Sequence, residues 1–191
     1  MNDIFNDSEF VNQYYEMLKD YQDEFVQNKF LKFIPKNLKV LELGFGTGLD
    51  YFALKDFYEY TISDYSKAFI DEFKKRYNID AIQIDAKFID INEKFDCIFS
   101  NKVLHVFTDE ELVLSFDSQY NALYSDGYIF HTLWYSKDAI PDEYANRVNE
   151  AKLIELLDKK FEVIHSETYS EMEDEDSIVF IAKKLVSINA D

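Results

Sequence analysis

The sequence predicts an α/β fold: a doubly wound, mostly parallel sheet of seven strands with a C-terminal antiparallel hairpin and helices on both faces. Short β-prone runs alternate with helical segments along the 191-residue chain, which is typical of a parallel sheet covered on both faces. Only an acidic segment separates the last two β-prone runs, so we expect them to pair as a hairpin. Three of the 4 glycines fall in one pentapeptide, Gly44 to Gly48, directly after the first predicted strand.

Periodicity and turn signals predict each element in order. Apolar residues at spacings of three and four predict an amphipathic helix within residues 8–31. Asp126 and Gly127 predict a turn before the fifth strand. Further helices are expected at 49–57, from Ser66 as N-cap, at 109–124 and at 147–160, and strands at 39–43, 60–63, 81–84 (buried), 95–100, 128–134, 161–168 and 177–184. We expect one domain over residues 1–191, in which residues 1–35 form a helical segment able to act as a lid.

Composition and charge exclude several classes of protein. The chain is 47% hydrophobic and 17% aromatic with only 2 prolines, so it is neither disordered nor of low complexity. Its net charge of −18 and its short basic clusters disfavour nucleic acid and anionic membranes as partners. A single cysteine, Cys97, and three scattered histidines give neither a disulfide nor a zinc spacing.

Targeting signals and the acidic run at 167–176 also bear on localisation and partners. The acidic N-terminus does not have the pattern of a signal peptide, and no apolar run approaches the length of a membrane span. We therefore expect a cytoplasmic protein without metal, nucleic-acid or membrane partners. The acidic run is interpreted either as a solvated turn or as a rim that attracts a cationic substrate.

The glycine loop and two acids predict a binding site. A strand, a glycine-rich turn and a helix place backbone N–H groups where an anionic group can bind. The G-x-G-x-G spacing differs from the G-x-G-x-x-G of nicotinamide-binding folds, and no Walker A lysine follows. Asp64 ends the second predicted strand and Asp85, followed by the small Ala86, ends the third. Because the carboxyl ends of neighbouring parallel strands face one crevice, these acids and the loop would converge on a nucleoside-shaped ligand. The alternatives are a tight structural turn for the loop and helix or turn caps for the acids.

With these residues the sequence resembles the Rossmann-like (class I) S-adenosylmethionine (SAM)-dependent methyltransferases over about residues 38 to 184. The resemblance rests on the segments 42–48, Asp64-Tyr65-Ser66, Asp85-Ala86, 95–101 and Val103-Leu104-His105. It implies SAM as cofactor, with Gly44, Gly46 and Gly48 against its methionine part, Asp64 on the ribose, and Asp85 with Ala86 at the adenine; Glu42, Tyr65 and Ser100 are further cofactor-binding candidates. Phe45 departs from the family, which more often has a small residue or cysteine there.

The resemblance further implies methyl transfer to a small-molecule acceptor. His105 is the candidate catalytic base, although such a base is optional because the cofactor supplies the electrophile. The candidate substrate-binding residues are Tyr14, Asn101, His105, Trp134 and Tyr135. Tyr14 lies on an aromatic stripe that is interpreted as core or as a lid over the cofactor. Two other functions remain open: a non-catalytic SAM-binding or interaction module on the same fold, and a nicotinamide-dependent oxidoreductase.

Overall fold

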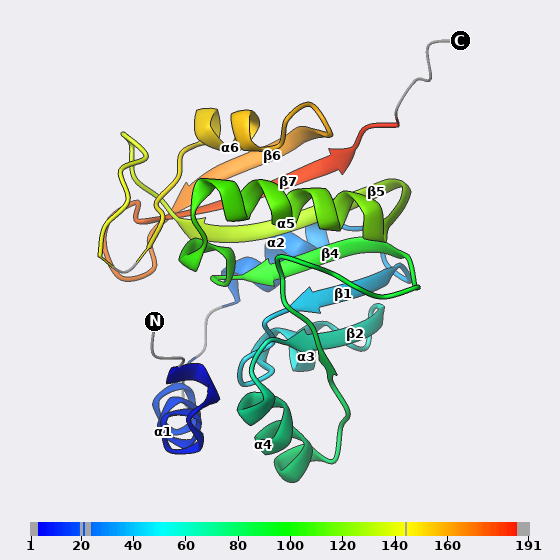
Figure 1. The fold of residues 1–191 in the computed structure, drawn as a ribbon, viewed down its shortest axis with the longest axis vertical. Coiled ribbons are helices and arrows are strands. Elements are labelled where there is room, and N and C mark those ends of the chain that lie inside the picture. The colour runs from blue at the N-terminus through cyan, green and yellow to red at the C-terminus, as the bar shows by residue number, and fades with distance from the viewer. Residues whose placement is uncertain (1–3, 20, 22–23, 144, 187–191) are drawn as a thin grey trace.

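The computed structural model describes residues 4–19, 21, 24–143 and 145–186. Its sheet contains seven strands in the order β3-β2-β1-β4-β5-β7-β6 (Figure 1). The strands β1 to β5 are parallel, and β7 lies antiparallel between β5 and β6. The predicted fold class, including the C-terminal hairpin, is confirmed.

The strand and helix bounds follow the sequence pattern closely in the sheet and less closely in the helices. Lys39–Leu43 and Ser177–Lys184 are strands at the predicted bounds, whereas the helices after β1 and after β5 are shorter than expected. The elements are η1 (Ile4–Asn6), α1 (Ser8–Leu18), α2 (Phe25–Phe33), β1 (Lys39–Leu43), α3 (Leu49–Leu54), β2 (Glu59–Asp64), α4 (Lys67–Tyr77), β3 (Ile82–Gln83), β4 (Phe95–Asn101), η2 (Leu104–Val106), α5 (Asp109–Ala122), β5 (Leu123–Trp134), α6 (Glu150–Leu156), β6 (Phe161–Tyr169) and β7 (Ser177–Lys184).

The N-terminal segment forms two helices, α1 and α2, rather than the single helix expected within residues 8–31. Their apolar faces are buried against different partners. Val11 and Tyr15 of α1 pack with α4, whereas Phe30 of α2 lies against the sheet and is 0% exposed. Because one straight helix cannot cover both surfaces, the apolar stripe is divided between two. α1 lies beside α4, away from the body of the sheet (Figure 1).

The third strand differs from the prediction of a buried strand at 81–84. β3 has only two residues, Ile82 and Gln83, both of them exposed, at the edge of the sheet. Its pairing with β2 covers only these two positions, and one further bond, from the Ile84 N–H to the Asp64 carbonyl at 3.0 Å, follows them. β5 in turn begins at Leu123 and contains the Asp126-Gly127 segment as an irregularity, with a φ of +65° at Asp126. The expected turn is therefore a bulge within the strand.

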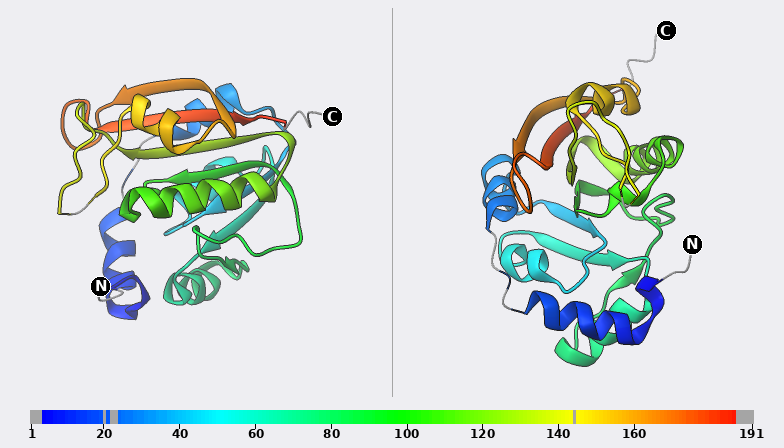
Figure 2. Two further views of the ribbon diagram at one scale, coloured as in Figure 1. Left: turned by 45° about the horizontal axis from the view of Figure 1, so that its top comes forward. Right: turned by 90° about the vertical axis from the view of Figure 1, so that its left-hand side faces the viewer.

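Helices cover both faces of the sheet (Figure 2). α5 and α6 enclose one apolar cluster that includes Ile98 and Ile129, while α2 and α3 enclose another on the opposite face that includes Phe99 and Phe130. No helix in the described part of the chain is long and apolar enough to cross a membrane. The described residues also contain no group of three or more His, Cys, Asp or Glu side chains placed to hold a metal ion.

Candidate active site

The glycine loop, residues Gly44–Gly48, joins the end of β1 to the start of α3. Its glycines all have positive φ angles, +73° at Gly44, +54° at Gly46 and +85° at Gly48, which side chains rarely tolerate. A Cβ atom at Gly44 would lie 2.5 Å from Val103 Cγ2, and one at Gly48 would lie 2.9 Å from Phe73 Cζ. At Gly46 the nearest atom would be a ring carbon at 4.0 Å. The two ends of the loop are therefore closely packed, and its middle leaves room for another group to approach.

Asp64, the last residue of β2, is bound to this loop. The Gly46 N–H donates to Asp64 Oδ2 at 3.2 Å and the Ser66 N–H donates to Oδ1 at 2.8 Å. Burial raises the pKa of Asp64 to about 6, against the opposing effect of the N–H groups of Ser66, Gly46 and Tyr65. The predicted meeting of the loop and Asp64 is thus present in the structure.

Glu42 is a second buried carboxyl group beside the loop, on β1. It is 1% exposed, and its Oε2 has no hydrogen-bond partner among the described residues. Burial, reinforced by the charge of Asp50, raises the pKa of Glu42 well above its usual value, and the nearby Tyr60 hydroxyl opposes this rise. Buried carboxyl groups normally have hydrogen-bond partners, and the buried Tyr60 hydroxyl lies beside this one as a donor.

The Asp85-Ala86 turn leaves the sheet next to Asp64. The Ile84 N–H donates to the Asp64 carbonyl at 3.0 Å, which places the two acids after neighbouring strands as the sequence predicts. Ala86 is 6% exposed, whereas the side chain of Tyr65, which follows Asp64, is 53% exposed. This edge therefore presents an aromatic ring and two acids near the glycine loop.

Tyr14 of α1 lies over the glycine loop. Its Cε1 is the atom nearest to the position that a Cβ of Gly46 would take, and its ring packs edge to face on Phe69 with centroids 5.5 Å apart. Burial raises the pKa of Tyr14, and the charges of Glu171 and Asp64 add to the rise. Charges of both Asp64 and the acidic turn that joins β6 to β7 therefore act on the Tyr14 hydroxyl.

Ser100, near the end of β4, is buried in the protein interior. It is 0% exposed, and its Oγ lies 2.7 Å from Nδ1 of the fully buried His131. Its hydroxyl is therefore engaged by His131, whereas the other β4 candidate, Asn101, lies in a polar network at the strand end.

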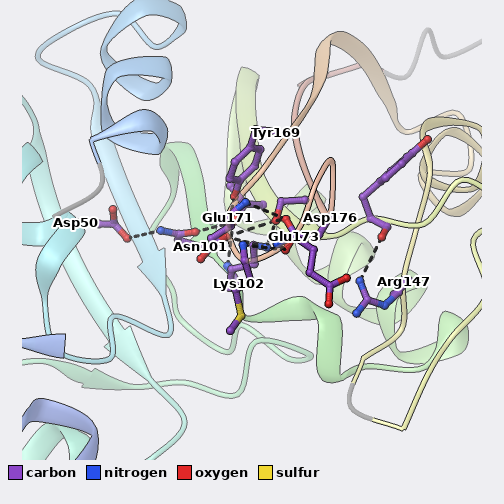
Figure 3. A network of polar contacts seen from close by, with 12 residues as sticks. Asp50, Asn101, Lys102, Arg147, Tyr169, Glu171, Glu173 and Asp176 are labelled. Carbon is purple, nitrogen blue, oxygen red and sulfur yellow. Dashed lines mark hydrogen bonds and ion pairs between the residues drawn. The ribbon is translucent and has the colours of Figure 1, made fainter. Parts of the chain in front are cut away.

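That network connects the helix after the glycine loop to the ends of β4 and β5. Asn101 Nδ2 donates to Asp50 Oδ2 at 3.0 Å, and Thr132 Oγ1 donates to Asn101 Oδ1 at 2.6 Å. Asp50 is 7% exposed and also accepts from Gln27 Nε2 of α2. These bonds fix the orientation of the Asn101 carboxamide. Figure 3 shows Asn101 between Asp50 on one side and the cluster around Lys102 on the other.

Lys102 anchors the acidic turn to the end of β4. Its Nζ lies 2.9 Å from Glu171 Oε2 and donates to Ser177 Oγ at 2.6 Å. The same ammonium group lies 3.2 Å from the centroid of the Trp134 ring and 5.6 Å from that of Tyr169. Burial lowers the pKa of Lys102 and the Glu171 carboxylate opposes the shift, so the cation is stabilised by a carboxylate and aromatic faces.

His105 lies beside this cation. Its ring meets that of Trp134 edge to face with centroids 6.3 Å apart, and its buried Nδ1 has no hydrogen-bond partner within the described chain. Burial, together with the charge of Lys102, lowers the pKa of His105 to about 4. At neutral pH the imidazole is therefore uncharged.

Tyr135 is held at the same edge through its backbone. Its N–H donates to the Asp176 carbonyl at 2.6 Å, and its carbonyl accepts from Arg147 at 3.3 Å. Surface clefts lie elsewhere, one between α1 and α4 and one beside β6 that Tyr135 helps to line. Neither cleft is lined by the glycine loop.

Sequence reasoning missed Asp50, Lys102 and the pairing of Lys102 with Glu171. Asp50 is two residues past Gly48, but nothing in its spacing distinguishes it from a solvated acid at a helix start. Glu171 belongs to the acidic run at 167–176 that the sequence analysis interprets, but Lys102, with a φ of +54°, meets it only through a tertiary contact that leaves no signal in the sequence.

The packing at the glycine loop predicts unequal costs for two alanine substitutions. We expect Gly48→Ala to lower the free energy of unfolding by about 2–3 kcal/mol, because the positive φ and the contact with the Phe73 ring both oppose a Cβ. Gly46→Ala meets only the backbone strain, about 1 kcal/mol. Urea unfolding of the two variants tests this, and equal losses would contradict the described packing.

The buried Asp64 predicts a pH dependence of stability. Since its pKa is raised to about 6 in the folded protein from about 4 when unfolded, the contribution of Asp64 to stability is fully present below pH 4 and is lost as the pH rises through 6. In urea unfolding between pH 4 and pH 6.5, we expect Asp64→Asn to gain about 2–3 kcal/mol relative to the wild type. A difference between the two proteins that does not change with pH would refute the assigned shift.

Comparison with known proteins gives the same fold. The N-methyltransferase NodS from Bradyrhizobium japonicum WM9, solved with S-adenosyl-L-homocysteine (SAH), is 16% identical with a TM-score of 0.72 and covers 94% of this chain and 98% of its own. Magnesium protoporphyrin IX methyltransferase from Synechocystis PCC 6803, also with SAH, is 18% identical with a TM-score of 0.71, covering 96% and 97%. A SAM-dependent methyltransferase from Clostridium acetobutylicum ATCC 824 is 14% identical with a TM-score of 0.69, covering 92% and 98%. At these identities the likeness is one of fold.

A family model locates the shared domain within the chain. Residues 40–127, which extend from β1 into β5, match the model described as a methyltransferase domain. No curated protein sequence matches the chain. The resemblance indicated by the sequence motifs is therefore confirmed at the level of the fold: residues 40–127 match the model of a methyltransferase domain, and the chain has the Rossmann-like fold seen in the SAM-dependent methyltransferases.

Proposed function

We propose that this protein is a SAM-dependent methyltransferase that transfers a methyl group to a small-molecule acceptor. One observation carries the proposal: the glycine loop, Asp64 and the Asp85-Ala86 turn follow three neighbouring parallel strands, β1, β2 and β3. The strand order reverses between β1 and β4, and in open α/β sheets ligands bind at such a reversal, outside the carboxyl ends of the strands.

The charges of the residues at this edge support SAM as the ligand. Asp64 would accept hydrogen bonds from ribose hydroxyls, and Asp85 with Ala86 would meet the adenine. SAM carries a positive sulfonium and an ammonium group, and the buried carboxyl groups of Glu42 and Asp64 lie next to the loop. Of the other cofactor candidates, Tyr65 offers an exposed ring beside Asp64, whereas Ser100 offers no free hydroxyl.

The acceptor would bind at the ends of β4 and β5. Asn101, Trp134 and His105 meet there, with Tyr14 on the opposite side. SAM supplies a methyl group bound to a positive sulfur, and the protein aligns the acceptor and excludes water. The neutral His105, with its unpartnered Nδ1, would take the proton that a hydroxyl or ammonium acceptor releases. The segment between β5 and α6 is short, which favours a small acceptor over a macromolecule.

The arrangement of the chain extends this proposal. We propose one domain over residues 1–191 in which the N-terminal segment, residues 1–35, closes over the cofactor through Tyr14. Of that segment, residues 1–3, 20, 22 and 23 lie outside the described residues. The free Cys97 is buried, which agrees with activity in the reducing cytoplasm.

Calorimetry with SAM and SAH tests the cofactor. We expect the wild type to bind both, and Asp64→Ala to weaken binding by about 10- to 100-fold, because hydrogen bonds to a charged group are lost. Asp126→Ala is the matched control: it removes an acid on the β5 bulge that pairs with Lys183 at 3.1 Å, and should leave binding unchanged. Absence of binding to either ligand would refute the proposal, and binding of NADH instead would favour an oxidoreductase.

A transfer assay tests the chemistry. The wild type is incubated with SAM and a panel of amines, phenols and carboxylic acids, and methylated products are detected by mass spectrometry. We expect His105→Gln to lower kcat by about 100-fold for an acceptor that must lose a proton, with unchanged affinity for SAH. Tight SAH binding with no transfer to any acceptor would instead favour a non-catalytic module.

A further inference from the structure

The turn that follows β3 is held by a helix as well as by the edge of the sheet. β3 pairs with β2 through only two residues, Ile82 and Gln83, and the Ile84 N–H donates to the Asp64 carbonyl at 3.0 Å. Beyond Ile84, α5 supplies contacts to the Asp85-Ala86 turn. Ser115 Oγ donates to the Ala86 carbonyl at 2.7 Å, and the Ile89 N–H donates to Ser118 Oγ at 2.7 Å.

These contacts come from one face of α5. Lys87 Nζ pairs with Glu111 at 3.1 Å, and Glu111, Ser115 and Ser118 are spaced four and three residues apart, which places them in a row along the helix. Three positions of the turn region, 86, 87 and 89, are therefore bonded to the same polar stripe.

A chain of buried hydrogen bonds lies behind this stripe. Gln119 Nε2 donates to Ser115 Oγ at 3.1 Å, His131 Nε2 lies 2.8 Å from Gln119 Oε1, and Ser100 Oγ lies 2.7 Å from His131 Nδ1. All four side chains are 0% exposed. Burial lowers the pKa of His131 to about 3, so its imidazole is neutral.

All the hydrogen bonds in this chain run in the same direction. The Ser115 hydroxyl donates its only proton to the Ala86 carbonyl, so its oxygen accepts from the Gln119 amide. The Gln119 carbonyl oxygen then accepts from His131 Nε2–H, which leaves Nδ1 to accept from Ser100. Because each group donates to the next and none is unpaired, the chain is a cooperative unit that ends on the Ala86 carbonyl.

The direction of that carbonyl determines the direction of the Asp85 side chain. In a trans peptide the C=O and N–H groups point opposite ways, so a carbonyl held toward α5 turns the Lys87 N–H away from it. That N–H donates to Asp85 Oδ1 at 2.9 Å. One oxygen of Asp85 is thereby held in place and the other is left for a ligand.

We infer that Ser115, Gln119 and His131 are positioning residues that orient the Asp85 carboxylate and thereby set a preference for adenine in the cofactor. The inference rests on the proposed function. Adenine presents an amino group that donates to a carboxylate, whereas hypoxanthine presents a carbonyl that a carboxylate repels. A fixed carboxylate distinguishes the two bases strongly, and one free to turn distinguishes them less.

Calorimetry with SAH and its deaminated analogue S-inosylhomocysteine tests the inference. For the wild type we expect SAH to bind more tightly. In Ser115→Ala, which removes one hydroxyl and keeps the helix, we expect the ratio of the two dissociation constants to fall about fivefold, equivalent to one hydrogen bond. Gln119→Met, which interrupts the chain further from the turn at similar side-chain length, should lower the ratio in the same direction.

Leu112→Ala is the matched control. Leu112 is a fully buried apolar residue of the same helix, so its truncation lowers stability without touching the polar stripe, and the ratio should not change. An unchanged ratio in both Ser115→Ala and Gln119→Met would overturn the inference while SAH binding by the wild type upholds the proposed function. Failure of the wild type to bind SAH would overturn both.

Discussion

The hydrogen bond between the Gly46 N–H and the buried carboxylate of Asp64 is the interaction on which the rest of the site depends. It joins the loop after β1 to the end of β2, and the second oxygen of Asp64 accepts from Ser66, the residue that caps α4. One side chain thereby sets the position of two helix starts relative to the sheet. This arrangement costs free energy because it removes the carboxylate from water, and burial raises the pKa of Asp64 for the same reason. A ligand that donates hydroxyl groups to Asp64 would offset that cost.

Most of the fold could be predicted because its signals are local. The run from Lys39 to Leu43 ends at a glycine whose φ no other residue tolerates well, so both the strand and the loop are visible in the sequence. Ser66 is similarly identified as an N-cap, and its hydroxyl does accept from the Phe69 N–H at 3.1 Å. Because the ends of neighbouring parallel strands meet at one edge of the sheet, the sequence alone then predicts that Asp64 and Asp85 lie at the same edge.

What could not be predicted depends on contacts between distant segments. The division of the N-terminal apolar stripe into α1 and α2 follows from the separate surfaces that Tyr15 and Phe30 meet. The stripe itself has continuous helical spacing. The acidic run at 167–176 is not simply a solvated turn. Asp176 accepts from the N–H groups of Glu171, Met172 and Glu173, and these bonds with that of Ser177 hold its pKa at about 2 although burial would raise it. No spacing rule connects such a loop to a lysine some 70 positions earlier.

The position of Trp134 has a spectroscopic consequence. It is the only tryptophan of the chain, and it lies near the ends of β4 and β5 with an ammonium group on its face and the His105 ring beside it. The indole emission of this protein is therefore a single-site signal. Any molecule that enters between Asn101 and the acidic turn, or that shifts Lys102, changes the polarity and the quenching around that one ring. The protein thus carries an intrinsic fluorescent reporter at the proposed acceptor site, with no label required.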